Sequence, residues 1–335
     1  MTTRGAILVT GGAGYIGSHT CKQLAAAGYL PVAFDNLARG HRNAVRWGPL
    51  VEGDIRDAAA LEGAIRQYRP SAICHIAALA YVGESVADPA AYYSNNVVGT
   101  LSVLEAARRT GIERLVFSSS CATYGAPDVL PVSEAAAQRP ISPYGRSKLM
   151  GEQIIQDYGR AYASRSVILR YFNACGCDPA GEIGEWHSPE THLVPRVLMA
   201  AHGILPSIEI YGDDHATPDG TCVRDYIHVT DLARAHGLAL EHLARGGESL
   251  ALNLGTGQGL SVQQILEAAA RQTGHPVPST IKPRRRGDPP ILYADPTLAR
   301  RKLGFMTQHS DIETILGTAR AELVSRQPVS VAEPR

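Results

Sequence analysis

Short β-rich runs alternate with helical stretches through the first half of the chain. The runs expected to form strands are residues 6–10, 30–34, 50–52, 72–76, 114–118 and 167–172, and helical patterns cover 17–27, 58–68, 95–109 and 144–162. This alternation predicts parallel strands joined by right-handed crossovers. The expected fold class is therefore α/β, with a Rossmann-like doubly wound parallel sheet.

The pattern loosens after residue 174. Gly, Pro, His and acidic residues crowd segments 176–192 and 212–221, with short strand-like pieces between them. We expect a dinucleotide-binding domain over residues 1–174 and a smaller C-terminal α/β substrate domain over residues 175–335. The second domain should lie over the carboxyl ends of the strands, where doubly wound sheets bind ligands. Segment 223–256 is expected to cross back to the first domain.

The first expected strand runs directly into a glycine-rich turn. Its glycines stand at Gly11, Gly14 and Gly17. This spacing permits a tight turn and brings the backbone and the following helix N-terminus close to a pyrophosphate. Asp35 ends the second strand, where a carboxylate accepts hydrogen bonds from ribose hydroxyls and repels a 2′-phosphate. The glycine-rich turn together with Asp35 favours NAD over NADP, although the nearby Arg39 could attract a 2′-phosphate. Asp54, after the third strand, is placed to meet the adenine.

A tyrosine is followed four residues later by a lysine, at Tyr144 and Lys148. On a helix this spacing puts the phenol and the ammonium on one face. A free phenol has a pKa of about 10, but a neighbouring cation stabilises the phenolate, so Tyr144 could exchange a proton with a sugar or alcohol hydroxyl. Ser120, at the end of the fifth strand, could hydrogen-bond the reacting oxygen. These residues predict proton removal from a hydroxyl coupled to hydride transfer from the same carbon.

The residues after Ser120 narrow the reaction. Cys121 and Ala122 stand where a dehydration would need an acid and a base, and neither carries a carboxyl group. A plain dehydrogenase would release reduced cofactor, whereas an epimerase returns the hydride to the opposite face and needs no additional side chain. The absence of a carboxyl group favours epimerisation.

Composition excludes several other classes of function. The chain has 335 residues with 32 Lys+Arg and 32 Asp+Glu, which gives no electrostatic reason to expect nucleic acid or an anionic membrane as a partner. No apolar run approaches the ~18 residues of a membrane span, and the start has no signal-peptide pattern. Cys175 and Cys177 have no second Cys/His pair at metal-finger spacing. We expect a cytoplasmic enzyme without a metal site.

Several longer motifs resemble those of the UDP-glucose (UDP-galactose) 4-epimerase family, which belongs to the extended short-chain dehydrogenase/reductases. They are Gly-Gly-Ala-Gly-Tyr-Ile-Gly-Ser at 11–18, Val-Gly-Glu-Ser at 82–85, Leu-Arg-Tyr-Phe-Asn at 169–173, Asp-Gly-Thr at 219–221 and Val-Arg-Asp-Tyr-Ile at 223–227. The resemblance implies tightly bound NAD, with Tyr144 as base. It also implies that Lys148 holds the nicotinamide ribose and lowers the pKa of the tyrosine, and that Ser120 binds the 4-oxygen of the substrate.

The same resemblance implies further binding positions. Those for the cofactor are Tyr15, Ile16, Asn36, Ile55, Asn95 and Phe172. Those for UDP are Asn173, Leu193, Tyr211, Arg224, Arg285 and Asp288. Arginines suit a diphosphate because they form bidentate hydrogen bonds, and Tyr211 can pack against uracil. The 4-keto sugar would rotate while its UDP stays fixed, and a homodimer packed through helices 95–109 and 144–162 is also implied.

Three positions depart from the commonest pattern of this family. Ala80 replaces a lysine that contacts the cofactor, and His192 replaces an asparagine near the diphosphate. Thr123 comes one place later than the usual threonine, and a continuing strand would turn its hydroxyl to the other face. No role is therefore assigned to Thr123.

The identity of the sugar stays open. Leu292 aligns with a position that limits sugar size and is intermediate between the tyrosine of restrictive members and the cysteine of permissive ones, so we expect some UDP-N-acetyl sugar to be accepted. The segments around Ala80 and Cys121 also resemble UDP-xylose/UDP-arabinose 4-epimerases. Two alternatives are less favoured. Cys121 and Ala122 argue against a UDP-sugar dehydratase, and the joint presence of Ser120, Tyr144 and Lys148 argues against a non-catalytic NAD-binding regulator.

Overall fold

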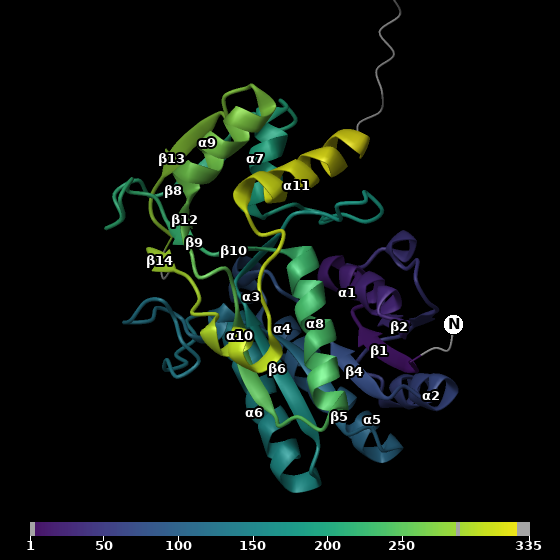
Figure 1. Ribbon diagram of the computed structural model, residues 1–335. Helices are drawn as coiled ribbons and strands as arrows, with labels where there is room; N and C mark the ends of the chain where they lie inside the picture. Colours follow the sequence, from purple (N-terminus) through teal and green to yellow (C-terminus); the bar gives the residue numbers. More distant parts are fainter. Residues whose placement is uncertain (1–3, 286–288, 327–335) are drawn as a thin grey trace, which may run out of the picture.

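A seven-stranded parallel sheet forms the centre of the computed structural model, which describes residues 4–285 and 289–326 (Figure 1). Its strand order is β3-β2-β1-β4-β5-β6-β11, and all neighbouring strands in it are parallel. The strands are β1 (Ala6–Thr10), β2 (Leu30–Asp35), β3 (Leu50–Glu52), β4 (Ala72–His75), β5 (Arg114–Ser120), β6 (Arg165–Tyr171) and β11 (Leu250–Leu254). The expected α/β doubly wound fold is confirmed.

Helices cover both faces of this sheet, which explains why nearly all residues of β1, β2 and β4 are buried. Alternate residues of β1 enter two separate cores, because successive strand side chains point to opposite faces. Ile7 and Val9 pack with α1 (Tyr15–Ala26) and α8 (Val229–Ala244). Leu8 packs in the second core, which includes residues of α2 (Ala58–Tyr68), α5 (Gly99–Thr110) and α6 (Pro143–Tyr162).

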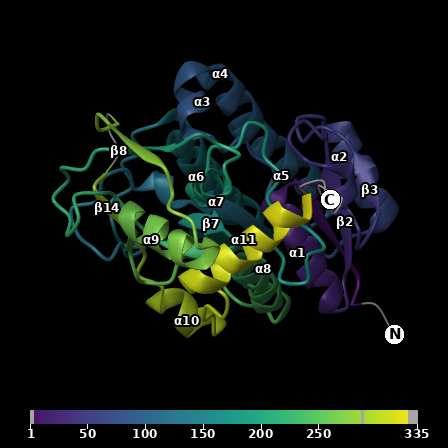
Figure 2. The ribbon, with the colours of Figure 1, turned by 90° about the horizontal axis from the view of Figure 1, so that it is seen from above.

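The later part of the chain forms smaller sheets and a third core. Figure 1 shows α7 (Leu193–Ala201), α9 (Val262–Thr273) and α11 (Ile312–Arg326) gathered away from α5 and α6, and Figure 2 shows α9 and α11 side by side from above. The short strands are β7 (Asn173–Cys175), β8 (Ile208–Tyr211), β9 (Val223–Arg224), β10 (Tyr226–His228), β12 (Leu260–Ser261), β13 (Ser279–Lys282) and β14 (Ile291–Leu292). They pair as β8 with β13, β7 with β10, and β9 between β12 and β14.

Short helical pieces complete the described chain. They are η1 (Arg42–Ala44), α3 (Val82–Ala87), α4 (Pro89–Tyr92), the π-helical turn η2 (Tyr93–Val98), η3 (Cys121–Thr123) and α10 (Thr297–Leu303). The expected helix over 95–109 thus begins inside the π-turn. The strand β5 ends at Ser120, as expected, and does not continue to Thr123, whose hydroxyl donates a hydrogen bond back to the Ser120 carbonyl at 3.0 Å.

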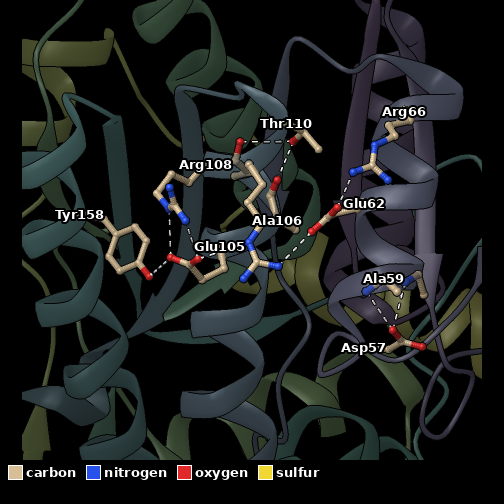
Figure 3. A network of polar contacts seen from close by, with 12 residues as sticks. Asp57, Ala59, Glu62, Arg66, Glu105, Ala106, Arg108, Thr110 and Tyr158 are labelled. Atoms are coloured by element: carbon tan, nitrogen blue, oxygen red, sulfur yellow. Dashed lines mark hydrogen bonds and ion pairs between the residues drawn. The ribbon is translucent and has the colours of Figure 1, made fainter.

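Polar contacts join the outward faces of α2, α5 and α6. Figure 3 shows Glu105 of α5 between Arg108 of the same helix and Tyr158 of α6, whose hydroxyl donates to it at 2.5 Å. On α2, the carboxylate of Asp57 caps the N-terminus, and Arg66 pairs with Glu62. Most of these side chains are partly exposed, so solvent screens each pair and it contributes little to the stability of the fold.

A buried ionic network ties α6 to the sheet. Arg170 of β6 donates to both oxygens of Glu152, and Ser119 of β5 donates to the same carboxylate. Arg170 also donates to the hydroxyl of Tyr124 at 2.9 Å, which in turn donates to Asn253 of β11 at 2.7 Å. The side chains of Glu152 and Arg170 are only 1% and 5% exposed. Each charge therefore depends on the other for its stability in the interior.

We predict that Glu152→Gln destabilises the protein by about 3–5 kcal/mol, because it leaves the buried Arg170 without its counter-charge. Urea unfolding measures the change. Asp157→Asn is the matched control on the same helix, since its partner Arg160 is 77% exposed, and it should cost less than about 1 kcal/mol. Equal losses for the two variants would contradict the assignment.

Candidate active site

The glycine-rich turn lies between β1 and α1, as the sequence predicts. Gly11 has a left-handed φ of 72°, and a Cβ at Gly17 would lie 1.9 Å from the carbonyl oxygen of Gly11. Gly14 begins α1 without a side-chain cap, and no acidic residue stands in the first turn. A helix N-terminus without a side-chain cap suits a bound phosphate. Tyr15 and Ile16 follow in that first turn.

Asp35 is held beside the glycine-rich turn. Its carboxylate accepts a hydrogen bond from the Ala13 N–H at 3.0 Å and another from the Leu37 N–H at 2.8 Å. Burial raises the pKa of Asp35, and these N–H groups oppose the shift. The guanidinium of Arg39 is engaged elsewhere, because it pairs with Glu84 at 2.5 Å. The neighbourhood of Asp35 therefore suits ribose hydroxyls better than a 2′-phosphate.

A second set of expected cofactor residues follows β3. Asn36 donates to the Asp54 carboxylate at 3.2 Å, and Arg56 pairs with the same carboxylate at 2.7 Å. The hydrogen bonds from Arg56 hold the pKa of Asp54 well below its usual range. Ile55 is buried against Gly99 of α5, where a Cβ would lie 2.5 Å from the Ile55 Cδ1. Asp54 thus presents an anchored carboxylate at this edge of the sheet.

The residues of the turn and of the β2 and β3 ends fit a bound dinucleotide. A tight glycine turn leads into a helix start without a side-chain cap, and a fixed carboxylate follows at the end of β2. Asn95 lies in the π-turn η2, where its amide donates to the Asn96 side chain at 3.0 Å. Phe172 is buried in a small core that also contains Leu292.

The three expected catalytic residues lie on two neighbouring elements. Ser120 ends β5, and Tyr144 and Lys148 occupy the first turns of α6, which Ser142 caps by accepting a hydrogen bond from the Gly145 N–H at 3.1 Å. Tyr144 is 7% exposed and Lys148 3% exposed. The Lys148 ammonium donates to the Ser118 carbonyl at 2.7 Å. The spacing of Tyr144 and Lys148 therefore does place both on the face that meets β5.

Burial dominates the electrostatics of this trio. It raises the pKa of Tyr144 well above the ordinary value for a tyrosine, the nearby Tyr171 raises it further, and a hydrogen bond with the side chain of Ser120 lowers it. Burial also lowers the pKa of Lys148 to about 7, against an opposing effect of Glu152. The largest effects on the pKa of Tyr144 thus raise it, and the expected lowering by Lys148 is not among them.

The expected UDP residues come from separate elements of the later part of the chain. Arg285 lies 3.7 Å from the ring centre of Tyr211, at the end of β8. Arg224 of β9 pairs in register with Leu292 of β14. The charge of Arg224 also acts on the buried thiol of Cys121, whose pKa burial raises to about 12. Arg224 and its register partner Leu292 therefore lie near Cys121, the residue that follows Ser120.

Two other expected UDP residues flank the loop between β7 and α7. Asn173 begins β7 and its N–H donates to the Asp225 carbonyl at 2.9 Å, while Leu193 begins α7. Asp288 lies outside the described residues, which are 4–285 and 289–326.

The structure adds residues that the sequence pattern alone did not indicate. Asn96 donates to the Leu79 carbonyl and to the Ser147 hydroxyl at 3.0 Å each, which fixes the π-turn against α6. Glu152 lies on the same helix as the catalytic pair and anchors it. A spacing of four residues from Lys148 is a signal that could have identified Glu152.

We predict that Gly17→Ala purifies with at least about tenfold less bound NAD, because the added Cβ overlaps the backbone that would hold the pyrophosphate. Denaturing the protein and assaying the released cofactor measures the loss. Gly63→Ala, in the interior of α2 with no heavy atom of the described residues within 4 Å of the new Cβ, is the control. It should keep its NAD, and a similar loss in both variants would contradict the prediction.

The lowered pKa of Lys148 predicts a pH-dependent stability. Between the folded value of about 7 and the unfolded value of about 10.4, only the unfolded chain holds the lysine proton. This contribution to stability therefore rises with pH across that window. We expect Lys148→Met to be more stable than wild type near pH 7, and the difference in urea unfolding to shrink towards pH 10.

Lys22 is the control for this prediction, because its pKa is shifted in the opposite direction. Partial burial lowers its pKa, but hydrogen bonds to Asp178 and Glu182 outweigh this and raise it. Its contribution to stability is present below the unfolded pKa and disappears as pH rises through the folded value, so wild type should exceed Lys22→Met in stability at pH 7. A Lys148→Met difference that does not change with pH would contradict the assignment.

The comparisons with known proteins agree with this geometry. The sequence matches the NAD dependent epimerase/dehydratase family over residues 7–255. A UDP-glucose 4-epimerase of Rhizobium leguminosarum bv. trifolii is 53% identical over 313 residues, which cover 93% of this chain and 95% of the relative. A UDP-glucose 4-epimerase of Brucella ovis, solved in complex with NAD, is 59% identical with a TM-score of 0.93, over 95% of this chain and 98% of that one.

A more distant solved relative is the UDP-glucose 4-epimerase of Stenotrophomonas maltophila, with bound NAD and formylated UDP-arabinopyranose. It is 39% identical with a TM-score of 0.93, over 96% of this chain and 98% of that chain. The fold, the glycine-rich turn and the Ser120, Tyr144 and Lys148 trio agree with what such a family requires. The chain belongs to the NAD-dependent epimerase/dehydratase family and, within it, to the UDP-glucose 4-epimerases.

Proposed function

We propose that this chain interconverts UDP-glucose and UDP-galactose by inversion at C4, with tightly bound NAD and a transient 4-keto sugar. The observation that carries the proposal is the buried meeting of Ser120 at the end of β5 with Tyr144 on α6. A hydroxyl donor and a phenol at the mouth of a dinucleotide fold are the groups that alcohol oxidation needs.

The cofactor is held by the residues of the glycine-rich turn and the strand ends. Gly11, Gly14 and Gly17 admit the pyrophosphate, and Asp35 accepts the ribose hydroxyls. The remaining contacts would come from Tyr15, Ile16, Asn36, Asp54, Ile55, Asn95 and Phe172. When bound, NAD supplies a hydride acceptor whose positive ring also favours an anion beside it. The nicotinamide ribose would lie against Lys148.

The proton chemistry falls to Tyr144 and Ser120. Ser120 holds the 4-oxygen of the sugar by a hydrogen bond, and Tyr144 takes the proton of the 4-hydroxyl as the C4–H bond breaks with its electron pair. The reverse transfer returns the same proton to the 4-oxygen after the keto sugar has turned its other face. Lys148 favours the charged form of the phenol, which opposes the effect of burial.

The two residues after Ser120, Cys121 and Ala122, disfavour dehydration. Burial raises the pKa of the Cys121 thiol to about 12, so it is a neutral group at pH 7 and a poor acid. Ala122 has no ionisable group. A non-catalytic regulator would have no use for the combination of Ser120, Tyr144 and Lys148.

UDP would be held by groups on both sides of the crevice. Arg224 and Arg285 can neutralise its diphosphate, and Tyr211 can pack against the uracil. Asn173 and Leu193 flank the loop before α7, and Asp288 is expected to contribute from the segment after Arg285. The position of Leu292 in the family pattern implies that its size would limit the sugar, and it packs in one small buried core with Phe172.

The wider organisation follows from the same family membership. We propose that residues 1–174 with segment 223–256 bind NAD, because β11 adds to the central sheet, and that the rest of 175–335 binds the UDP-sugar. A homodimer packed through η2, α5 and α6 is supported by the exposed apolar side chains of Val98, Leu101 and Met150. None of the described helices is long and apolar enough to cross a membrane, and we propose a cytoplasmic location.

We predict that Tyr144→Phe lowers kcat by about 10²–10⁴-fold while bound NAD and UDP affinity are retained, because only the proton acceptor is lost. A coupled assay of UDP-galactose conversion measures kcat, and calorimetry with UDP measures whether binding is retained. Tyr158→Phe, which removes a phenol hydroxyl from the same helix at its contact with Glu105, is the control. A Tyr144→Phe enzyme that works at nearly the wild-type rate would refute the role of the base.

Incubation with UDP-galactose, UDP-arabinose and UDP-GlcNAc, without added NAD, tests the reaction and its range. We expect NMR to show inversion at C4 of UDP-galactose, and slower inversion of UDP-GlcNAc because Leu292 is of intermediate size. Conversion of UDP-GlcNAc below about one-thousandth of the UDP-galactose rate would retire the second expectation. A deoxy or decarboxylated product would refute epimerisation.

A further inference from the structure

A second cluster of ionisable side chains lies outside the catalytic trio, on the loop between β7 and α7. It consists of Glu185, His187, Glu190 and His192, which we call the loop cluster. One nitrogen or oxygen atom from each residue lies within 4.8 Å of the corresponding atoms of the other three. Two imidazoles and two carboxylates thus converge on one point.

The separations within the loop cluster are short. The Nδ1 atom of His187 lies 3.2 Å from the Glu185 carboxylate and 3.5 Å from that of Glu190. The Nδ1 atom of His192 lies 2.9 Å from each of the same two carboxylates. Four ligands bound tetrahedrally at about 2.0–2.2 Å from zinc stand roughly 3.3–3.6 Å from one another. The loop cluster therefore has nearly the dimensions of such a site and needs only a small expansion.

Two atoms of the loop cluster are buried without a hydrogen bond. The Oε1 atom of Glu185 and the Nδ1 atom of His187 form no hydrogen bond of good geometry in the described structure, although they lie 3.2 Å apart and the Glu185 Oε1 atom also lies 2.9 Å from the Nδ1 atom of His192. The side chain of Glu185 is only 3% exposed. A buried carboxylate oxygen without a hydrogen bond is costly. A cation between the four groups would satisfy both atoms at once.

We propose that Glu185, His187, Glu190 and His192 bind one zinc ion per chain. Imidazole nitrogen with carboxylate oxygen suits zinc, whereas magnesium and calcium prefer ligand sets made of oxygen alone. In the bound state two carboxylates and two neutral imidazoles balance the two charges of the ion. The side chain of His192 is 41% exposed, so the site is open to solvent on one side and an ion can reach it. The sequence predicted no metal site, because Cys175 and Cys177 have no second Cys/His pair at metal-finger spacing.

The position of the site gives it a structural role. The ring of His187 packs edge-on against Tyr15 at 5.8 Å and against Tyr81 at 5.9 Å. Tyr15 begins α1 at the glycine-rich turn, and its hydroxyl donates to the Gly176 carbonyl at 2.5 Å. Leu193, directly after the last ligand, begins α7. Zinc would therefore fasten the loop between the cofactor turn and α7, and would take no part in proton or hydride transfer.

Metal binding by the untagged full chain tests the proposal. After incubation with excess Zn²⁺ and removal of the free ion, wild type should hold about one zinc per chain by mass spectrometry. His187→Gln and Glu190→Gln should each bind Zn²⁺ at least about tenfold more weakly in competition with a chromophoric chelator. Glu182→Gln is the matched control, because it lies on the same loop but pairs with Lys22 at 2.5 Å. It should behave as wild type.

Two further readouts do not depend on enzyme activity. Co²⁺ in place of Zn²⁺ should give the intense visible absorption of a tetrahedral site in wild type and Glu182→Gln, and Zn²⁺ should raise the Tm of these two proteins but not of His187→Gln. Wild type that binds no Zn²⁺, or that binds it no more tightly than His187→Gln, would overturn the proposal. The four side chains would then form an ion-pair cluster only. Epimerase activity is not part of either outcome.

Discussion

The position of the proposed catalytic groups on α6 depends on one buried ion pair, between Glu152 and Arg170. Tyr144, Lys148 and Glu152 are spaced four residues apart and so share one face of α6. The Glu152 carboxylate is fixed by Arg170 of β6 and by Ser119 of β5, which sets the rotation of the helix about its axis. Fixing the third member of this row also directs the phenol and the ammonium to the end of β5.

A second constraint comes from the shared direction of the strands. Because β1, β2 and β5 are parallel, Thr10, Asp35 and Ser120 all end at the same edge of the sheet. The glycine-rich turn follows at that edge, and the small C-terminal sheets gather there. The residues proposed to bind the cofactor and those proposed for catalysis, although distant in sequence, thus come to one edge of the sheet, where doubly wound folds bind ligands.

The sequence predicted those parts of the structure that periodicity and spacing determine. Strands 6–10 and 50–52 and helix 58–68 have the expected bounds, since apolar patterns directly reflect burial. The π-turn at Tyr93–Val98 was not predicted, because no residue pattern marks an extra residue in a helical turn. The end of the fifth strand at Ser120 was predicted, but the 3-10 turn that follows it at Cys121–Thr123 was not. The loop cluster was not predicted either, because its four side chains converge in a segment whose sequence has no periodicity.

Spacing also showed which groups are neighbours without showing how deeply they are buried. Tyr144 and Lys148 were correctly placed on one face, but burial raises the pKa of the phenol. The central claim is that this phenol becomes the base once NAD and nucleotide are bound. The most direct test is an ultraviolet difference titration of the NAD-loaded enzyme with UDP, wild type minus Tyr144→Phe. The account predicts a phenolate signal that develops below about pH 9, and a phenol that stays fully protonated above that pH would contradict it.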